Sequence, residues 1–169
     1  MTKQETQEKT RIASRATAEL KAGAQEAAQV AQAFPEAIAF YMIAAGAQIA
    51  IDRCPDDRHP GELAASALEP WFANLRAGSV TPESEELVKA LAKKRTFDAR
   101  SERGIVQAVN NAIDRCAVAA VPLGVVAWYL MRIGAEIAQS AVSRGFADAI
   151  IIHASAPAMQ SWSVEHCAI

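Results

Sequence analysis

Two long stretches of the chain contain no charged residue, and they limit the folds that the sequence can adopt. They are residues 37–51 and 116–131. Each is bracketed by charged residues and is shorter than the roughly 20 apolar residues that a helix needs to cross a bilayer. In water such stretches must be buried, and a helix that is apolar on nearly all sides belongs in the middle of a core. We therefore expect two central helices surrounded by amphipathic ones, and no membrane insertion. A short membrane hairpin is the alternative.

Composition favours helices throughout. Hydrophobic residues make up 51% of the chain, but aromatic residues only 6%, and alanine is frequent. Alanine, leucine and the long polar side chains favour helix, whereas strands require β-branched and aromatic residues in alternation. At 169 residues the chain suits one domain. We predict one all-α domain, residues 1–169, that is a bundle of six or seven helices with flexible ends at residues 1–10 and 157–169.

Prolines and capping residues mark where these helices begin and end. The expected helices span about 3–33, 35–53, 63–75, 81–95, 103–121, 123–144 and 146–154. Pro35 and Pro82 each suit the first turn of a helix, and Thr81 suits the N-cap position. Pro70 is expected to kink or divide the third helix. Gly145 is expected to end the sixth.

The pentapeptide Ala-Ile-Asp-Arg-Cys occurs twice, at residues 50–54 and 112–116. The similarity continues at the same offset, which indicates an internal helical duplication around residues 43–65 and 105–127. Chance similarity in a chain rich in alanine and isoleucine is the alternative. Each Asp-Arg pair ends an apolar run. If the duplication is real, we expect the two pairs to pack together as an ion-pair network that fixes helix register.

Asp56, Asp57, Arg58 and His59 form the best candidate for a small site. The aspartates and the imidazole could hold a divalent metal, or His59 could act as a base oriented by an aspartate. We favour a solvated loop in which Asp56 caps the next helix or pairs with Arg58. The sequence has no zinc-ligand spacing, phosphate-binding loop or hydrolase motif. We therefore predict no catalytic residue, no metal and no cofactor.

The only concentration of basic residues follows the fourth expected helix. It comprises Lys93, Lys94, Arg95, Arg100 and Arg103. Such a cluster can bind a phosphate backbone by displacing counterions, but Asp98 and Glu102 dilute its field, and the net charge of −2 attracts no polyanion. We favour a solvated helix end. A nucleic-acid-associated helical subunit that uses residues 93–103 is the alternative function.

Residues 54–60, followed by Trp71 and Arg76, resemble Ala-rich helical immunity proteins that neutralise bacterial toxins. The resemblance covers a small part of the chain, and no residue role is carried over from it. We predict a non-enzymatic interaction or accessory protein, of toxin-neutralising or regulatory type, that binds a macromolecular partner. The loop at 56–59 and the basic segment are its candidate contact residues. A small-molecule or metal-binding helical bundle is the second alternative.

The expected first helix suggests a homodimer. A narrow apolar seam runs along residues 3–33, and such a seam suits either the outside of a bundle or a coiled coil with a second copy. Three cysteines stand without close spacing, and residues 1–21 are polar, unlike a secretory leader. Reduced thiols and a cytoplasmic location are the resulting expectations.

Overall fold

Seven α-helices make up most of the part of the chain that the computed structural model describes, which is residues 2–31, 34–53, 59–75, 79–93 and 99–166. They are α1 (Lys3–Ala31), α2 (Pro35–Arg53), α3 (Pro60–Phe72), α4 (Pro82–Ala92), α5 (Ala99–Val118), α6 (Leu123–Ala141) and α7 (Arg144–His166). No strand occurs within these ranges. The predicted all-α bundle of six or seven helices is confirmed.

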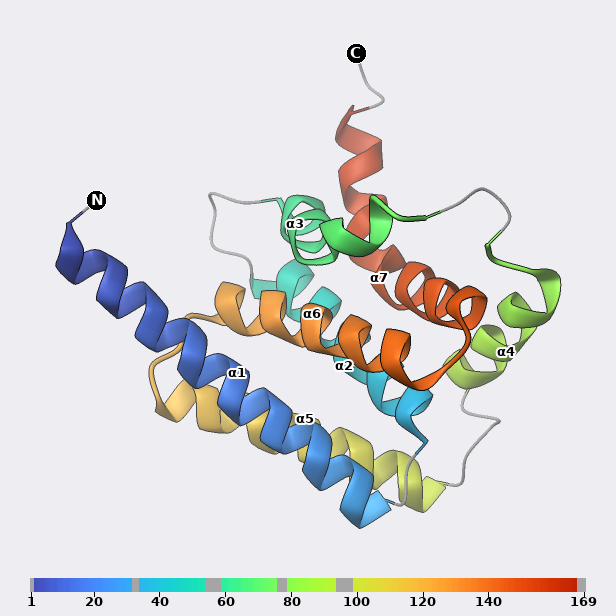
Figure 1. Ribbon diagram of the computed structural model, residues 1–169, viewed down its shortest axis with the longest axis horizontal. Coiled ribbons are helices and arrows are strands. Elements are labelled where there is room, and N and C mark those ends of the chain that lie inside the picture. The colour runs from blue at the N-terminus through green and yellow to red at the C-terminus, as the bar shows by residue number, and fades with distance from the viewer. Residues whose placement is uncertain (1, 32–33, 54–58, 76–78, 94–98, 167–169) are drawn as a thin grey trace.

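The helices stack in three layers (Figure 1). In the first layer, α1 and α5 lie side by side and run in opposite directions. The middle layer consists of α2 and α6, which also run in opposite directions and share the most extensive helix–helix contact. On the other side of this layer lie α3 and α7, with α4 packed against α7. The two stretches without charge therefore contribute most of the middle layer, α2 and the first half of α6, as predicted.

Two glycines allow the central helices to approach closely. A Cβ atom on Gly46 would lie 2.7 Å from the carbonyl oxygen of Ala127, and one on Gly134 would lie 2.7 Å from Cγ1 of Ile43. Each helix thus presents a glycine to the backbone or side chains of the other. In the described part of the chain, no helix is both long enough and apolar enough to cross a membrane.

The apolar seam of α1 packs on α5. Its residues Ala16, Leu20, Ala24 and Ala27 are buried, and Gly23 lies so close to α5 that a Cβ atom there would clash with Ala112. The seam that suggested a homodimer is therefore covered within the same chain. A homodimer through residues 3–33 would have to use another face of α1. It stays a prediction, which the mass of the protein in solution would test.

The C-terminal third differs from the sequence-based prediction. The sixth helix ends at Ala141 rather than Arg144, because Val142 is extended. Gly145 does not end a helix: it lies in the first turn of α7, where a Cβ atom would clash with the carbonyl oxygen of Ser79. The expected last helix, 146–154, instead runs through Pro157 to His166.

Tertiary packing accounts for the continuation of α7. Proline inside a helix removes one backbone hydrogen bond and normally kinks or ends the helix. Here Ala154 and Ala158, on either side of Pro157, are both fully buried or nearly so, and α7 packs against α2 and α3. The third helix likewise continues through Pro70 to Phe72. The expected end of the last helix before Pro157 is therefore wrong, because neighbouring helices hold the chain helical there.

The two copies of the pentapeptide begin in the same local setting. Each begins in the final turns of a helix, α2 or α5, and the next helix starts near a proline. The expected ion-pair network between the copies stays a prediction, because the side chain of Arg53 lies outside the described residues. Nε of Arg115 lies 3.0 Å from Oε2 of Glu19 on α1, and Oδ1 of Asp52 accepts a hydrogen bond from Gln48. Duplication stays a hypothesis.

Candidate functional site

His59 serves as the N-cap of α3. Its Nδ1 accepts a hydrogen bond from the backbone N–H of Gly61 at 3.3 Å, which satisfies one of the free donors at a helix start. Asp56, Asp57 and Arg58 lie outside the described residues. Among the described residues, no group of three or more histidine, cysteine or acidic side chains is arranged to hold a metal ion. His59, the one residue of the 56–59 loop that the structure describes, therefore has a structural role as a helix cap.

The structure describes only part of the basic segment. Lys93 is exposed at the C-cap of α4, and Arg103 is exposed on α5. Lys94 and Arg95 lie outside the described residues, and for Arg100 only the backbone, at the start of α5, is described. Binding of nucleic acid by this segment stays a prediction.

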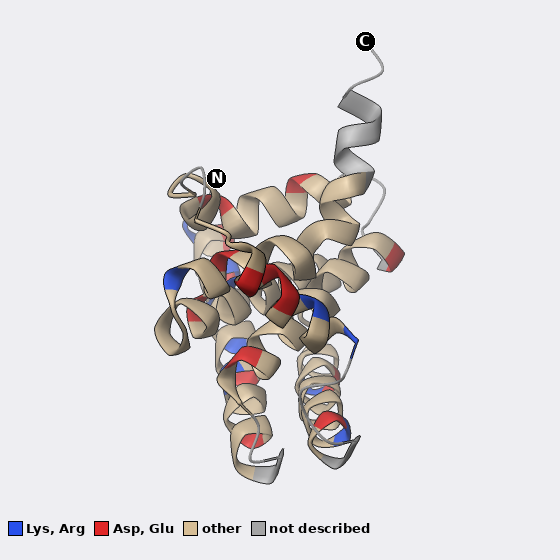
Figure 2. Cartoon of the chain, turned by 90° about the vertical axis from the view of Figure 1, so that its right-hand side faces the viewer, with Lys and Arg blue, Asp and Glu red and all other residues tan. Residues whose placement is uncertain are grey.

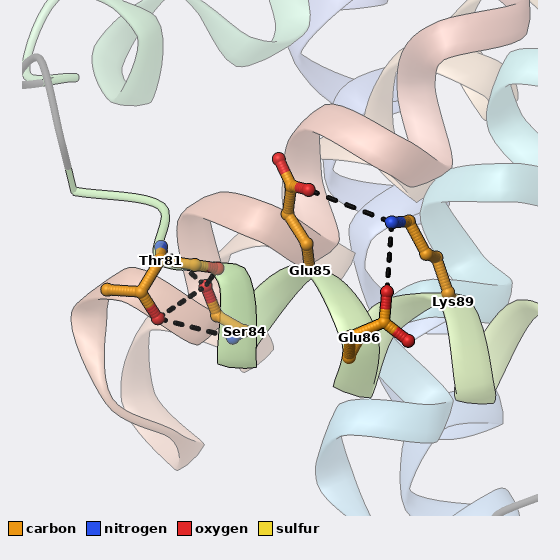
Figure 3. A network of polar contacts seen from close by, with 5 residues as sticks. All are labelled: Thr81, Ser84, Glu85, Glu86 and Lys89. Atoms are coloured by element: carbon orange, nitrogen blue, oxygen red, sulfur yellow. Dashed lines mark hydrogen bonds and ion pairs between the residues drawn. The ribbon is translucent and has the colours of Figure 1, made fainter.

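Acidic residues surround Lys89, a lysine of α4 that lies one turn before Lys93. Nζ of Lys89 lies 3.1 Å from Oε1 of Glu86 and 3.8 Å from Oε2 of Glu85 (Figure 3). The hydrogen bond with Glu86, followed by the charge of that carboxylate, raises the pKa of Lys89. Figure 2, in which the α4 side of the molecule faces the viewer, shows acidic residues next to basic ones here. Lys89 is therefore less available to an external phosphate than an unpaired lysine would be.

The described cysteine is not activated as a nucleophile. Cys116 is a free thiol and is buried. Burial, and then the nearby charge of Glu19, raise the pKa of its thiol. The thiolate is the reactive form of cysteine, so this environment suits an apolar packing residue. Cys54 and Cys167 lie outside the described residues.

Two tryptophans from different helices share one arginine on the surface where α3 meets α6. The guanidinium carbon of Arg132 lies 5.7 Å from the ring centre of Trp71 and 5.1 Å from that of Trp128. Nε1 of Trp128 donates a hydrogen bond to Oγ of Ser66 at 3.2 Å. We call Ser66, Trp71, Trp128 and Arg132 the tryptophan face. Nε of Arg132 also lies 3.6 Å from Oε1 of Glu136, four residues further along the same helix face.

A crevice adjoins the tryptophan face at the ends of three helices. Its lining comprises Pro70, Trp71, Asn74, Gln139, Arg144 and Asp148, and it encloses about 370 Å³. We call it the α3–α7 crevice. Trp71 belongs to both features. The crevice therefore joins residues from α3 and the turn after it, the C-terminal end of α6 and the first turns of α7.

Asp148 is the unusual member of this lining. Only 4% of its side chain is exposed. Oδ1 accepts a long hydrogen bond, 3.4 Å, from Nε2 of Gln139, whereas Oδ2 is buried and has no hydrogen-bond partner. Nε of Arg144 stands 4.0 Å from Oδ2. A buried carboxylate oxygen without a donor is costly and uncommon.

Neither feature was predicted from the sequence. The four-residue spacing of Trp128 and Arg132, which places a ring and a cation on one helix face, was the available signal for the tryptophan face. Asp148 stands alone among the buried residues Ala147, Ala149 and Ile150. A single carboxylate in an otherwise apolar run was the available signal for a buried polar site.

Comparison with known proteins adds no information on function. No protein-family model, curated protein or solved structure matches this chain. The resemblance to immunity proteins has no support from these comparisons, and of the residues that suggested it the structure describes His59, Pro60 and Trp71.

Proposed function

We propose that this chain is a non-enzymatic helical accessory protein that binds a protein partner through the tryptophan face. The observation that carries the proposal is the sharing of one guanidinium by Trp71 and Trp128 at a partly exposed junction of two helices. Tryptophan and arginine dominate the energetic centres of protein interfaces. Their enrichment there reflects a large apolar area combined with a polar group that can bind the partner.

The face is also preorganised. Trp128 is held by the hydrogen bond to Ser66, and Arg132 by two rings and the carboxylate of Glu136. Side chains that are already ordered lose less conformational entropy when a partner binds. A partner would therefore meet a rigid surface on two packed helices. The toxin-neutralising or regulatory type of accessory protein belongs to this proposal, and so does a cytoplasmic location, supported by the free thiol of Cys116.

A matched pair of substitutions tests the proposal. Ser66→Lys places a long charged side chain on the tryptophan face and removes the acceptor of the Trp128 hydrogen bond. Ser14→Lys makes the same change at an exposed position of α1. Tagged proteins are expressed in the native host, and copurified proteins are quantified by mass spectrometry. We expect a partner that the wild type and Ser14→Lys retain and that Ser66→Lys loses by about tenfold or more, a loss of at least ~1.4 kcal/mol.

Retention of every specific partner by Ser66→Lys would contradict the proposal. Equal loss in both variants would contradict it too, because the loss would then not depend on the tryptophan face. Circular dichroism of both variants verifies that each is folded before the comparison is made.

A further inference from the structure

The buried carboxylate of Asp148 lacks a hydrogen-bond donor for one of its oxygens. It lies in the second turn of α7, and only 4% of its side chain is exposed to solvent. One oxygen has only the 3.4 Å bond from Gln139, and the other has none. Leaving a buried acceptor of a charged group unsatisfied is more costly than leaving a neutral one. A group that donates a hydrogen bond to Oδ2 would remove this cost.

Arg144 does not supply that donor. Its Nη2 donates to the backbone oxygen of Asn74 at 2.6 Å, which draws the guanidinium toward the turn after α3. The remaining approach to Asp148 is 4.0 Å from Nε to Oδ2, too long for a hydrogen bond. The Arg144 side chain is half exposed. The arginine thus compensates part of the charge and leaves Oδ2 without a hydrogen-bond donor.

We propose that the α3–α7 crevice binds a primary ammonium group, which donates to the carboxylate of Asp148 beside the ring of Trp71. An ammonium group carries the positive charge and the N–H donors that the carboxylate lacks. The indole of Trp71 provides an aromatic surface beside which a cation is favourable. The volume of about 370 Å³ is within the usual range for small-ligand sites.

Other ligand classes fit this lining less well. A divalent cation such as calcium takes six to eight oxygen ligands, several of them carboxylates, and Asp148 is the only carboxylate among the described residues that line the crevice. An anion would be attracted by Arg144, but the negative carboxylate of Asp148 would repel it. The ammonium group has two possible sources: a free small amine, or a lysine side chain of a docked protein.

Binding of two probes, measured by NMR chemical-shift changes, tests the proposal and separates these sources. Cadaverine represents a free amine, and lysine with its α-amino and carboxyl groups capped represents a protein side chain. Tetramethylammonium, a cation without an N–H donor, is the control ligand. We expect saturable shifts around the crevice with at least one probe and none with tetramethylammonium. The probe that binds more tightly identifies the source.

Three variants make the test specific to the carboxylate. Asp148→Asn should weaken binding by about tenfold or more, since a hydrogen bond to a charged group is lost. Asp114→Asn makes the same change at an exposed position of α5 and should leave the affinity unchanged. Arg144→Gln removes the competing cation and should tighten binding.

The proposal is overturned if neither probe gives saturable shifts, or if Asp148→Asn binds as tightly as the wild type. Should Asp148→Asn fail to fold, Arg144→Gln decides: tighter binding supports the proposal, and unchanged or weaker binding overturns it. The test does not involve a protein partner, so the proposed protein-binding function can fail while the ammonium site stands.

Discussion

At the scale of single residues, two glycines without side chains allow the central helices to pack closely. The central helices α2 and α6 touch through Gly46 and Gly134, where a methyl group would overlap atoms of the other helix. Leucine or isoleucine at these points would separate the helices and open cavities around the buried Met42 and Met131. The close approach therefore depends on glycine, despite its unfavourable helix propensity.

Substitution of one of these glycines should destabilise the protein in spite of improving helix propensity. A Cβ atom in Gly134→Ala would lie 2.7 Å from Cγ1 of Ile43 and 2.9 Å from the carbonyl oxygen of Ala39. Overpacking of this kind costs ~1–3 kcal/mol. The control is Gly124→Ala in the same helix, where a Cβ atom meets nothing within 4 Å. It should leave the free energy of unfolding, measured in urea, unchanged or raised by up to ~1 kcal/mol. Equal effects in the two variants would contradict the packing argument.

At the scale of elements, the helix starts follow local chemistry. Oγ1 of Thr81 accepts from the backbone N–H of Ser84, and Oγ of Ser84 accepts from the N–H of Thr81 (Figure 3). This reciprocal pair satisfies two donors at the start of α4. The start of α4 at Pro82 and of α2 at Pro35 were both predicted, because capping and the fixed φ of proline act within a few residues.

Loss of the α4 cap should be measurable. Thr81→Ala removes the side-chain acceptor for the N–H of Ser84 and should lower the free energy of unfolding by ~1 kcal/mol. Thr10→Ala is the control, since Thr10 is exposed within α1 and bonds only to the carbonyl oxygen of Thr6. Alanine has the higher helix propensity there, so this variant should be neutral or slightly more stable. Thermal unfolding of both variants checks the prediction, and a Thr81→Ala protein as stable as the wild type would refute it.

At the scale of the whole molecule, polar contacts between described residues join the layers at a few points. One of them links α2 to α5: Tyr41 is partly buried, and its hydroxyl bonds to Glu102. Burial, followed by the charge of Glu102 and this hydrogen bond, raises the pKa of Tyr41 to about 12. The folded protein therefore keeps the phenol proton at a pH at which the unfolded chain has lost it.

This contact predicts how stability changes in alkali. Below pH 10.0, the ordinary pKa of tyrosine, both states hold the proton and Tyr41 adds no pH dependence. Between pH 10.0 and about 12 the unfolded state releases it first, so the free energy of unfolding falls. In Tyr41→Phe, the urea midpoint should fall less steeply over this interval. The control variant Tyr129→Phe retains Tyr41 and should keep the steeper fall; a wild-type slope in Tyr41→Phe would contradict the assignment.

The sequence alone determined the all-helical class, the burial of α2 and α6, and several helix starts. These follow from composition, uncharged length and short-range capping, which need no knowledge of neighbours. Only the tertiary structure decided that α7 continues through Pro157, that α5 covers the seam of α1, and that Asp148 shares a crevice with Trp71. Those outcomes join residues distant in sequence, and packing between layers overrides local propensity where it buries enough side chains.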